Sequence, residues 1–383
     1  ENHYLSIIKK KEIIKKKKRI ILLLTAVMAM GLTACTNSSS GELKREETSA
    51  EVSADTEKTE TITITSLNAN KESKEIEVPY DPQRIAVLDM ASLDIIDNLG
   101  KGDRVVGSAS TTLDYLQSYV TDENITNLGT IKEADMEAVM ECEPDIIFIG
   151  GRLSASYDAL NEIAPVVYLA TDTQKGLVES VSDNARTIAS IFGLEKEVDG
   201  KTADFAARIE ALQKKAEGNT SLVGMTTSGS FNLMGNDGRC SIIGNEIGFD
   251  NLAADSVTES RGGGSEHSGS EEKASKETSD DLGKEGNGSG QGSTSTHGNE
   301  ASFETVVSMD PDYIFVMDRD SAIGTEGAQL AREIMENELI MKTDAYKNGK
   351  IVYLEHPAVW YTAEGGITAL DVMLSDLEGI LQQ

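Results

Sequence analysis

The sequence predicts an α/β protein of two Rossmann-like lobes joined by a single long helix, with a ligand cleft between the lobes. The first observation is a repeated segment, MEAVMECEPDIIFIGGR at residues 136–152 and FETVVSMDPDYIFVMDR at residues 303–319. Seven of the 17 aligned positions are identical, and each copy reads as a helix, a Pro-Asp break and a buried strand. The second observation is that strand and helix patterns alternate on both sides of one long helical pattern at Gly176–Phe192.

The elements follow in a regular order on each side of that helix. Before it we expect strands at residues 61–65, 85–88, 105–106, 146–149 and 166–169, and helices at 92–99 and 157–162. After it we expect a helix at 196–215, strands at 222–226, 232–234, 314–316 and 351–353, and a closing helix at 366–381. The alternative for the repeat is chance, because proline ends helices for generic reasons.

The N-terminal region has the pattern of a secretory signal. Eight basic residues lie in Lys9–Arg19, followed by the short apolar run Ile20–Gly31 and then Leu-Thr-Ala-Cys ending at Cys35. This last tetrapeptide is typical of the bacterial lipoprotein box, in which the cysteine is lipidated. The alternative is an ordinary signal anchor with an incidental cysteine. We therefore expect a lipid anchor on the outer face of a bacterial cytoplasmic membrane.

Composition sets the remaining boundaries. We predict a signal peptide at 1–34, a tether at 35–60, an N-terminal lobe at 61–175, a connecting helix at 176–195 and a C-terminal lobe at 196–383. Residues 258–296 are rich in Gly, Ser, Glu and Lys, and we expect a disordered insertion there. A net charge of −30 argues against nucleic acid as a partner. We expect Cys142 and Cys240 to be free thiols, although a disulfide between them stays open.

Several short motifs, in their order and spacing, carry a family resemblance. They are Val78-Pro79 with Pro82-Gln83-Arg84-Ile85, Asn127-Leu128-Gly129-Thr130, Gly151-Arg152, Gly238-Arg239 with Gly248-Phe249, His297-Gly298 with Ser302-Phe303-Glu304, Asp318-Arg319-Asp320-Ser321, and Trp360-Tyr361 with Gly365-Gly366. Together they resemble the substrate-binding proteins of iron–siderophore ABC transporters, in particular the catecholate branch. The resemblance runs from about Val78 to the C-terminus, apart from the insertion.

Three arginines are the candidate ligand-binding residues. Arg152 and Arg319 end the two repeat copies, just past the carboxyl end of each predicted strand, where open α/β sheets bind ligands. The resemblance adds Arg239 as the third arginine of the cleft, although Cys240 follows it where the family usually has an aromatic residue. Guanidinium groups stay charged and offer planar donors to catecholate oxygens. A surface ion pair is the alternative for each one.

The resemblance also implies roles for four other residues. His297 and Tyr361 match positions at which some members complete the iron shell, and Fe³⁺ accepts phenolate and imidazole ligands. The alternatives are a histidine at the end of a loose insertion and a tyrosine in the core. Glu137 and Glu304 match the glutamates that dock the permease, one on each lobe. Their alternative is favourable placement in the first turn of a helix.

These observations lead to one functional expectation. We expect a monomeric binding protein, not an enzyme, that captures a ferric siderophore and delivers it to an ABC permease. No intrinsic cofactor is expected, and Fe³⁺ arrives as part of the ligand. One alternative is a binding protein for haem, a corrinoid or a hydroxamate siderophore. Another is a surface sensor that uses the same fold.

Overall fold

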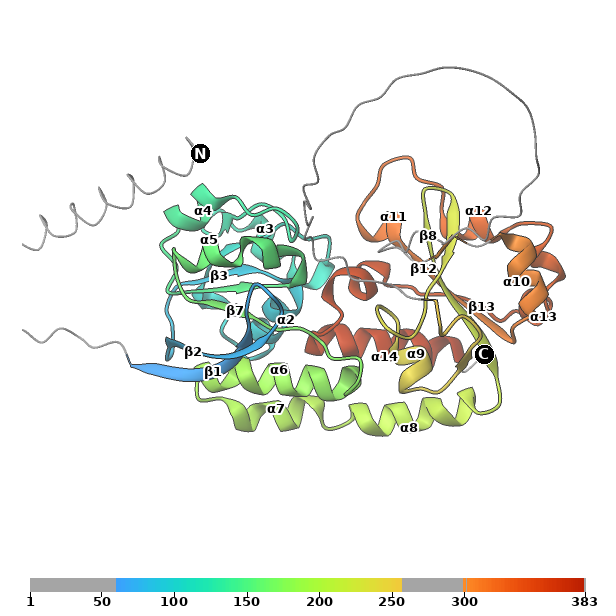
Figure 1. Ribbon diagram of the computed structural model, residues 1–383, viewed down its shortest axis with the longest axis horizontal. Helices are drawn as coiled ribbons and strands as arrows, with labels where there is room; N and C mark the ends of the chain where they lie inside the picture. The colour runs from blue at the N-terminus through green and yellow to red at the C-terminus, as the bar shows by residue number, and fades with distance from the viewer. Residues whose placement is uncertain (1–59, 257–298, 301, 382–383) are drawn as a thin grey trace, which may run out of the picture. The chain divides into compact units, whose positions relative to one another are not determined.

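The computed structural model describes residues 60–256, 299–300 and 302–381. Within them lie two larger β-sheets, each with helices packed beside it, and a two-stranded hairpin (Figure 1). This arrangement confirms the predicted α/β class with two lobes. The predicted signal peptide with Cys35, the tether, the insertion and His297 lie outside the described residues. No helix in the described ranges combines the length and apolar character needed to cross a membrane.

The first sheet is parallel and has the strand order β5-β4-β3-β6-β7. Its strands are β3 (Ile85–Leu88), β4 (Val105–Ser108), β5 (Thr126–Asn127), β6 (Ile146–Ile149) and β7 (Val166–Tyr168). The helices with it are α2 (Met90–Asn98), η1 (Gly102–Arg104), η2 (Asp114–Leu116), α3 (Ser118–Thr121), α4 (Met136–Glu141), η3 (Gly151–Ser156) and α5 (Tyr157–Asn161). β3 and β6 are fully buried. The chain order reverses between these two neighbours, which is where such sheets bind ligands.

An antiparallel hairpin precedes this sheet. It pairs β1 (Thr61–Leu67) with β2 (Ser73–Pro79). The sequence predicts the start of β1 from its Ile and Thr alternation but gives no β2. β2 is mostly exposed, so it lacks the buried apolar residues that mark a strand.

The second sheet has the order β11-β9-β8-β12-β13, and β10 pairs with β8 off this path. Its strands are β8 (Thr220–Thr227), β9 (Ser230–Leu233), β10 (Asp250–Asn251), β11 (Asn299–Glu300), β12 (Tyr313–Asp318) and β13 (Ile351–Tyr353). The helices after β9 are α9 (Ile242–Asn245), α10 (Phe303–Met309), α11 (Arg319–Ala322), α12 (Ala331–Met335), η4 (Ile340–Lys342), α13 (Asp344–Lys347), the π-helix η5 (Val359–Ala363) and α14 (Ile367–Leu381). β8, β12 and β13 are parallel, so this sheet has the same type of centre as the first.

Three helices lead from the first sheet to the second. They are α6 (Leu177–Ile191), α7 (Glu195–Thr202) and α8 (Phe205–Ala216). α6 matches the predicted long helix and buries one apolar face. The predicted helix at 196–215 is instead divided between α7 and α8. Gly200 and Asp204 are weak helix formers near the break.

The repeat is present in the structure as α4–β6 and α10–β12. In both copies the residue before the proline adopts a left-handed conformation, with φ of 44° at Glu143 and 41° at Asp310. This conformation is uncommon for residues other than glycine. Its occurrence at two equivalent positions shows that the two Pro-Asp breaks share one backbone path.

The repeat aspartates perform equivalent tasks in the two lobes. Asp145 Oδ2 accepts hydrogen bonds from the backbone N–H groups of Gln83 at 2.9 Å and Arg84 at 3.0 Å, just before β3. Asp312 Oδ2 accepts from Thr220 N and Thr220 Oγ1, both at 2.9 Å, at the start of β8. Each aspartate therefore joins its own strand to the neighbouring strand of the sheet.

Helix α14 connects the two halves of the described fold. It packs against α2 on one side and α8 on the other. The carboxylate of Asp94, fully buried in α2, accepts hydrogen bonds from Thr368 N and Ala369 N at 2.9 Å each, and from Tyr115 Oη at 2.8 Å. A β-carbon at Gly366 would collide with Asp94, so the approach of the two helices requires glycine there. Asp94 thus caps a helix distant in sequence.

The predicted free thiols are confirmed. Cys142 and Cys240 are both buried and unpaired. Burial raises the pKa of both thiols, which disfavours the reactive thiolate form.

Replacing Asp312 with asparagine tests the strand-joining role. We expect Asp312→Asn to lower the free energy of unfolding by about 1 kcal/mol at pH 7, because an amide is a weaker acceptor for Thr220. The hydrogen bond from the Thr220 backbone lowers the pKa of Asp312 from its ordinary value of 3.8. Its contribution is therefore complete above pH ~4 and is lost as the pH falls through the lowered pKa.

Urea unfolding at pH 7 and at pH 3 measures this difference. Asp255→Asn, at an exposed position, serves as the control. An Asp312→Asn variant as stable as the parent at pH 7 would contradict the role.

Candidate ligand-binding site

Tyr361 lies at the centre of the candidate site. It belongs to the π-helix η5, which ends just before α14. π-Helical turns are rare and occur frequently at functional sites. Tyr361 is buried, with 4% of its surface exposed. Both its ring and its backbone carbonyl face basic side chains.

The three predicted arginines come from three different elements. Arg152 follows β6 within η3, and Arg319 is the first residue of α11, directly after β12. Arg239 lies in the loop between β9 and α9. Arg152 and Arg319 therefore occupy equivalent positions past the carboxyl ends of the two repeat strands, as the sequence predicts.

The structure brings all three guanidinium groups around Tyr361. Their central carbons lie 5.5 Å (Arg152), 4.5 Å (Arg239) and 5.7 Å (Arg319) from the centroid of its ring. Arg152 Nη2 and Arg239 Nε donate to the Tyr361 carbonyl oxygen at 3.3 and 3.2 Å, and Arg319 Nε donates to the phenol oxygen at 3.3 Å. We call Arg152, Arg239, Arg319 and Tyr361 the arginine–tyrosine cluster.

The electrostatics of the cluster are those of a site with excess positive charge. Burial, and then the nearby charge of Arg239, lower the pKa of Arg152. Burial would raise the pKa of Tyr361, but the hydrogen bond from Arg319 and the charges of the three arginines outweigh it and lower the pKa. The cluster therefore favours negative charge at the Tyr361 oxygen.

One arginine of the cluster already has a carboxylate partner. Arg319 Nη1 lies 3.0 Å from Asp320 Oδ1. The buried Asp320 also accepts a hydrogen bond from Ser228 N at 2.7 Å. Arg319 is therefore held on the second-lobe side of the tyrosine ring, and it does not line the cavity described below.

A buried carboxylate fixes the residues before Tyr361. Asp376, in α14, accepts hydrogen bonds from the indole Nε1 of Trp360 at 2.9 Å and from His356 N at 3.2 Å. His356 Nδ1 lies 2.6 Å from the other carboxylate oxygen. Trp360 is fully buried. Asp376 is thus a positioning residue for η5, and sequence reasoning did not identify it.

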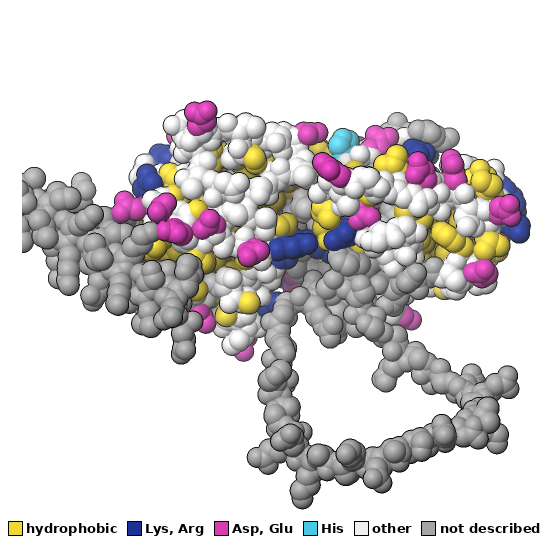
Figure 2. All heavy atoms as spheres, turned by 90° about the horizontal axis from the view of Figure 1, so that it is seen from above, with side chains coloured by type: hydrophobic (Ala, Val, Ile, Leu, Met, Phe, Trp, Pro, Cys, Tyr) yellow, Lys and Arg dark blue, Asp and Glu magenta, His cyan; other side chains and the backbone are white. Residues whose placement is uncertain are grey.

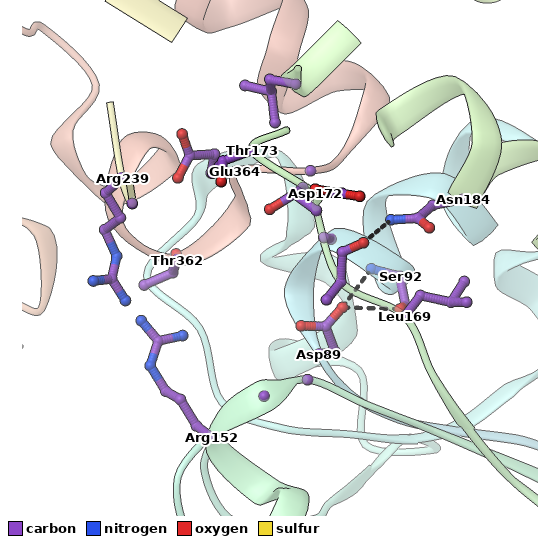
Figure 3. A pocket seen from close by; sticks show the side chains of 18 of the residues that line it. Asp89, Ser92, Arg152, Leu169, Asp172, Thr173, Asn184, Arg239, Thr362 and Glu364 are labelled. Carbon is purple, nitrogen blue, oxygen red and sulfur yellow. Dashed lines mark hydrogen bonds between the residues drawn. The ribbon is translucent and has the colours of Figure 1, made fainter. Parts of the chain in front are cut away.

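A cavity of about 740 Å³ opens beside the cluster (Figure 3). Loops of the first sheet, the Asp237–Arg239 loop and the segment Tyr361–Gly365 line it. Figure 3 shows Arg152 and Arg239 extending toward each other on one side, with Asp89, Asp172 and Glu364 elsewhere on the wall. Figure 2 shows one group of basic side chains in the middle of a face, with others toward its ends, whereas acidic ones are scattered over it.

The other predicted site residues have separate locations. Glu137 and Glu304 are exposed in the first turns of α4 and α10, one in each repeat copy. Asp89 and Glu364 line the cavity and were not identified from the sequence. Asp89 directly follows β3, so its place at the carboxyl end of a central strand could have indicated it.

The lowered pKa of Tyr361 can be measured directly. We expect Tyr361 to ionise below the ordinary phenol pKa of 10, whereas burial raises the pKa of Tyr115 and Tyr119. Arg319→Gln should raise the pKa of Tyr361, because it removes a positive charge and the hydrogen bond to the phenol. Tyrosinate absorbance against pH, with Tyr361→Phe subtracted, reports this group alone. A Tyr361 phenol that titrates at or above 10 would exclude the proposed charge balance.

Comparisons with known proteins identify the family of this chain. Residues 85–358 match the family described as periplasmic binding protein. The petrobactin-binding protein YclQ of Bacillus subtilis is 30% identical over 308 residues, covering 80% of this chain and 84% of YclQ. Its crystal structure has a TM-score of 0.68, with 85% of this chain and 99% of that chain covered.

Two further relatives also match most of this chain and most of their own length. The ferric-anguibactin-binding protein FatB of Vibrio anguillarum is 25% identical over 306 residues, covering 77% of this chain and 81% of FatB. The periplasmic catecholate-siderophore-binding protein VctP of Vibrio cholerae is 28% identical, with a TM-score of 0.65 and coverage of 83% and 100%. The chain therefore belongs to the periplasmic binding protein family.

Proposed function

We propose that this protein binds a ferric siderophore, in particular a catecholate one, and delivers it to an ABC permease for iron uptake. The observation that carries this proposal is the arginine–tyrosine cluster beside a cavity of about 740 Å³. That volume suits a small-molecule ligand. Relatives that bind petrobactin, ferric anguibactin and catecholate siderophores support the ligand class.

The charge of the ligand fits the cluster. A ferric catecholate complex carries up to about three negative charges, and planar guanidinium donors match its oxygen atoms. The chain as a whole has a net charge of −30, but charges further than ~10 Å away are largely screened. Arg152 and Arg239 are partly buried and lie on the cavity wall, so a ligand there meets their charges at short range.

Tyr361 is the proposed iron contact. A site that lowers the pKa of a phenol prepares it to bind Fe³⁺ as phenolate, a hard oxygen ligand. Such a ligand matters most for chelators with four donor atoms, which leave two iron positions open. The sequence-based prediction that His297 supplies the second protein ligand stays a prediction, and His297→Ala in the binding assay tests it.

The remaining alternatives concern the ligand. Haem, a corrinoid and a hydroxamate siderophore could fill a cavity of this size, but they make less use of clustered arginines. A surface sensor on the same fold would bind the ligand without passing it to a permease.

Lipidation at Cys35 would place the protein at the membrane. Labelling with a fatty-acid analogue tests whether Cys35 is lipidated.

Titrating the chain from Thr36 onward with ferric complexes, and following its fluorescence, tests which class of ligand binds. Trp360 is the sole tryptophan and adjoins Tyr361, so a bound ferric chromophore should quench its emission. We expect quenching by ferric bis- and tris-catecholates. Arg152→Gln and Arg239→Gln should each weaken binding about 10- to 100-fold, the loss of one charge-assisted hydrogen bond.

The control is Arg186→Gln, an exposed arginine on α6 that pairs with Asp199. It should leave affinity unchanged. Quenching by haem, cobalamin or a ferric hydroxamate but not by catecholates would refute the ligand class and leave the fold unaffected. Loss of tetradentate binding in Tyr361→Phe would support iron contact.

Charge reversal tests permease docking. Glu137→Lys and Glu304→Lys should leave ligand affinity unchanged, because both residues are exposed on α4 and α10, away from the cavity lining. Iron uptake by cells should fall at least tenfold in the double variant, since like charges then face the permease arginines. Uptake equal to that of the parent protein would show that docking uses other residues.

A further inference from the structure

Glu364 is a carboxylate on the cavity wall with one oxygen still available. It follows Tyr361 by three residues, between η5 and α14, and lines the same cavity as Arg152 and Arg239. Its Oε1 accepts a hydrogen bond from Cys240 N at 3.2 Å. Among the described residues no donor reaches Oε2. The carboxylate is therefore held at one oxygen while the other can receive a donor.

The backbone around Cys240 supports this orientation. Cys240 has a φ of 62°, in the left-handed region that few residues other than glycine adopt. This conformation directs its N–H to Glu364, while the neighbouring Arg239 side chain reaches the Tyr361 carbonyl. Strained backbone that persists at a ligand site often has a functional role. Here it fixes Glu364 beside the arginine–tyrosine cluster.

Glu364 is only partly exposed, so a second carboxylate oxygen without a donor loses part of its hydration at some cost. A donor from the ligand would remove this cost, and the siderophores proposed above have linkers between their iron-binding groups. We propose that Glu364 binds an N–H donor in the linker of the ligand, so that the site selects ferric chelates whose catecholate groups are joined through an amine. This inference rests on the proposed function and adds a specificity-determining residue to it.

The charged groups around Glu364 set the pH at which its carboxylate is ionised and can accept a hydrogen bond from a cationic amine. Burial raises the pKa of Glu364 to about 7, against the lowering effects of Arg239 and the Cys240 N–H. Glu246, after α9, raises it further. The other charged or titratable groups on the cavity wall are Asp89, Asp172, Asp237, Arg152, Lys71, Lys132 and the phenols of Tyr168 and Tyr361. The ionised form, which accepts from a cationic amine, becomes dominant as the pH rises through about 7.

A matched pair of ligands tests the assignment. Two ferric bis-catecholamides share the same iron-binding groups, one with a diethylenetriamine linker that places a secondary amine at its centre, the other with an ether oxygen there. We expect the amine-linked complex to bind about tenfold more tightly than the ether-linked one at pH 8.5, the effect of one charge-assisted hydrogen bond. This preference should shrink at pH 6.5. The ether-linked complex corrects for changes in iron speciation with pH.

Two variants separate the role of Glu364 from that of the other carboxylates on the cavity wall. Glu364→Gln keeps an oxygen for the Cys240 N–H and removes the charge, so the preference for the amine should fall below twofold at both pH values. Asp172→Asn, at another position on the cavity wall, should retain the tenfold preference. Circular dichroism confirms that each variant is folded.

The outcomes distinguish this inference from the proposed function. If both complexes bind equally tightly and Glu364→Gln changes nothing, the inference is wrong and siderophore binding stands. A preference for the amine that survives in Glu364→Gln also refutes it. A preference that grows as the pH falls would mean that protonation of the amine, and not ionisation of Glu364, sets the contact, against the inference. If neither complex binds, both the inference and the proposed ligand class fail.

Discussion

The whole site depends on holding three like charges around one aromatic ring. Three guanidinium groups would repel one another if they were left in a cavity without partners. Tyr361 reduces this cost in two ways, because its carbonyl oxygen accepts from two arginines and its ring and phenol face all three. A π-helical turn directs both the carbonyl and the ring of Tyr361 to basic groups. The segment around residue 361 is therefore both the anchor of the cleft and its chemical centre.

The internal repeat explains how two lobes come to present matching groups. Asp145 and Asp312 join equivalent pairs of strands, and the residues before the two prolines share an unusual backbone conformation. In each copy the arginine follows the aspartate by 7 residues. Once the aspartate has fixed its strand, the arginine must therefore lie at the carboxyl end of a central strand. The same local geometry, used twice, supplies two of the three arginines. The third, Arg239, comes from a loop outside the repeat.

Sequence patterns predicted the fold class and singled out Arg152 and Arg319, because both leave local or repeated traces, whereas Arg239 and Tyr361 were implied only by the family resemblance. β6 and β13 have the predicted bounds, since short apolar strands flanked by breaks are readily recognised. Glu364, Asp376 and Asp94 left no such trace. The contact between Cys240 and Glu364 joins residues 124 positions apart, and Asp94 caps a helix 274 positions away. Such pairings depend on the tertiary fold, which no local pattern encodes. The roles of His297 and the insertion lie beyond the described residues.

The placement of α14 has a consequence for biogenesis. This helix is the last one described, yet it packs against α2, which lies beside the first sheet. Asp94 of α2 caps its N-terminus, and its own Asp376 accepts a hydrogen bond from Trp360. A chain crossing the membrane from its N-terminus would export both sheets before this helix arrives. Until then, Asp94 would lack its helix and Tyr361 its support. A nascent chain would therefore gain its mature cleft only after α14 has been exported.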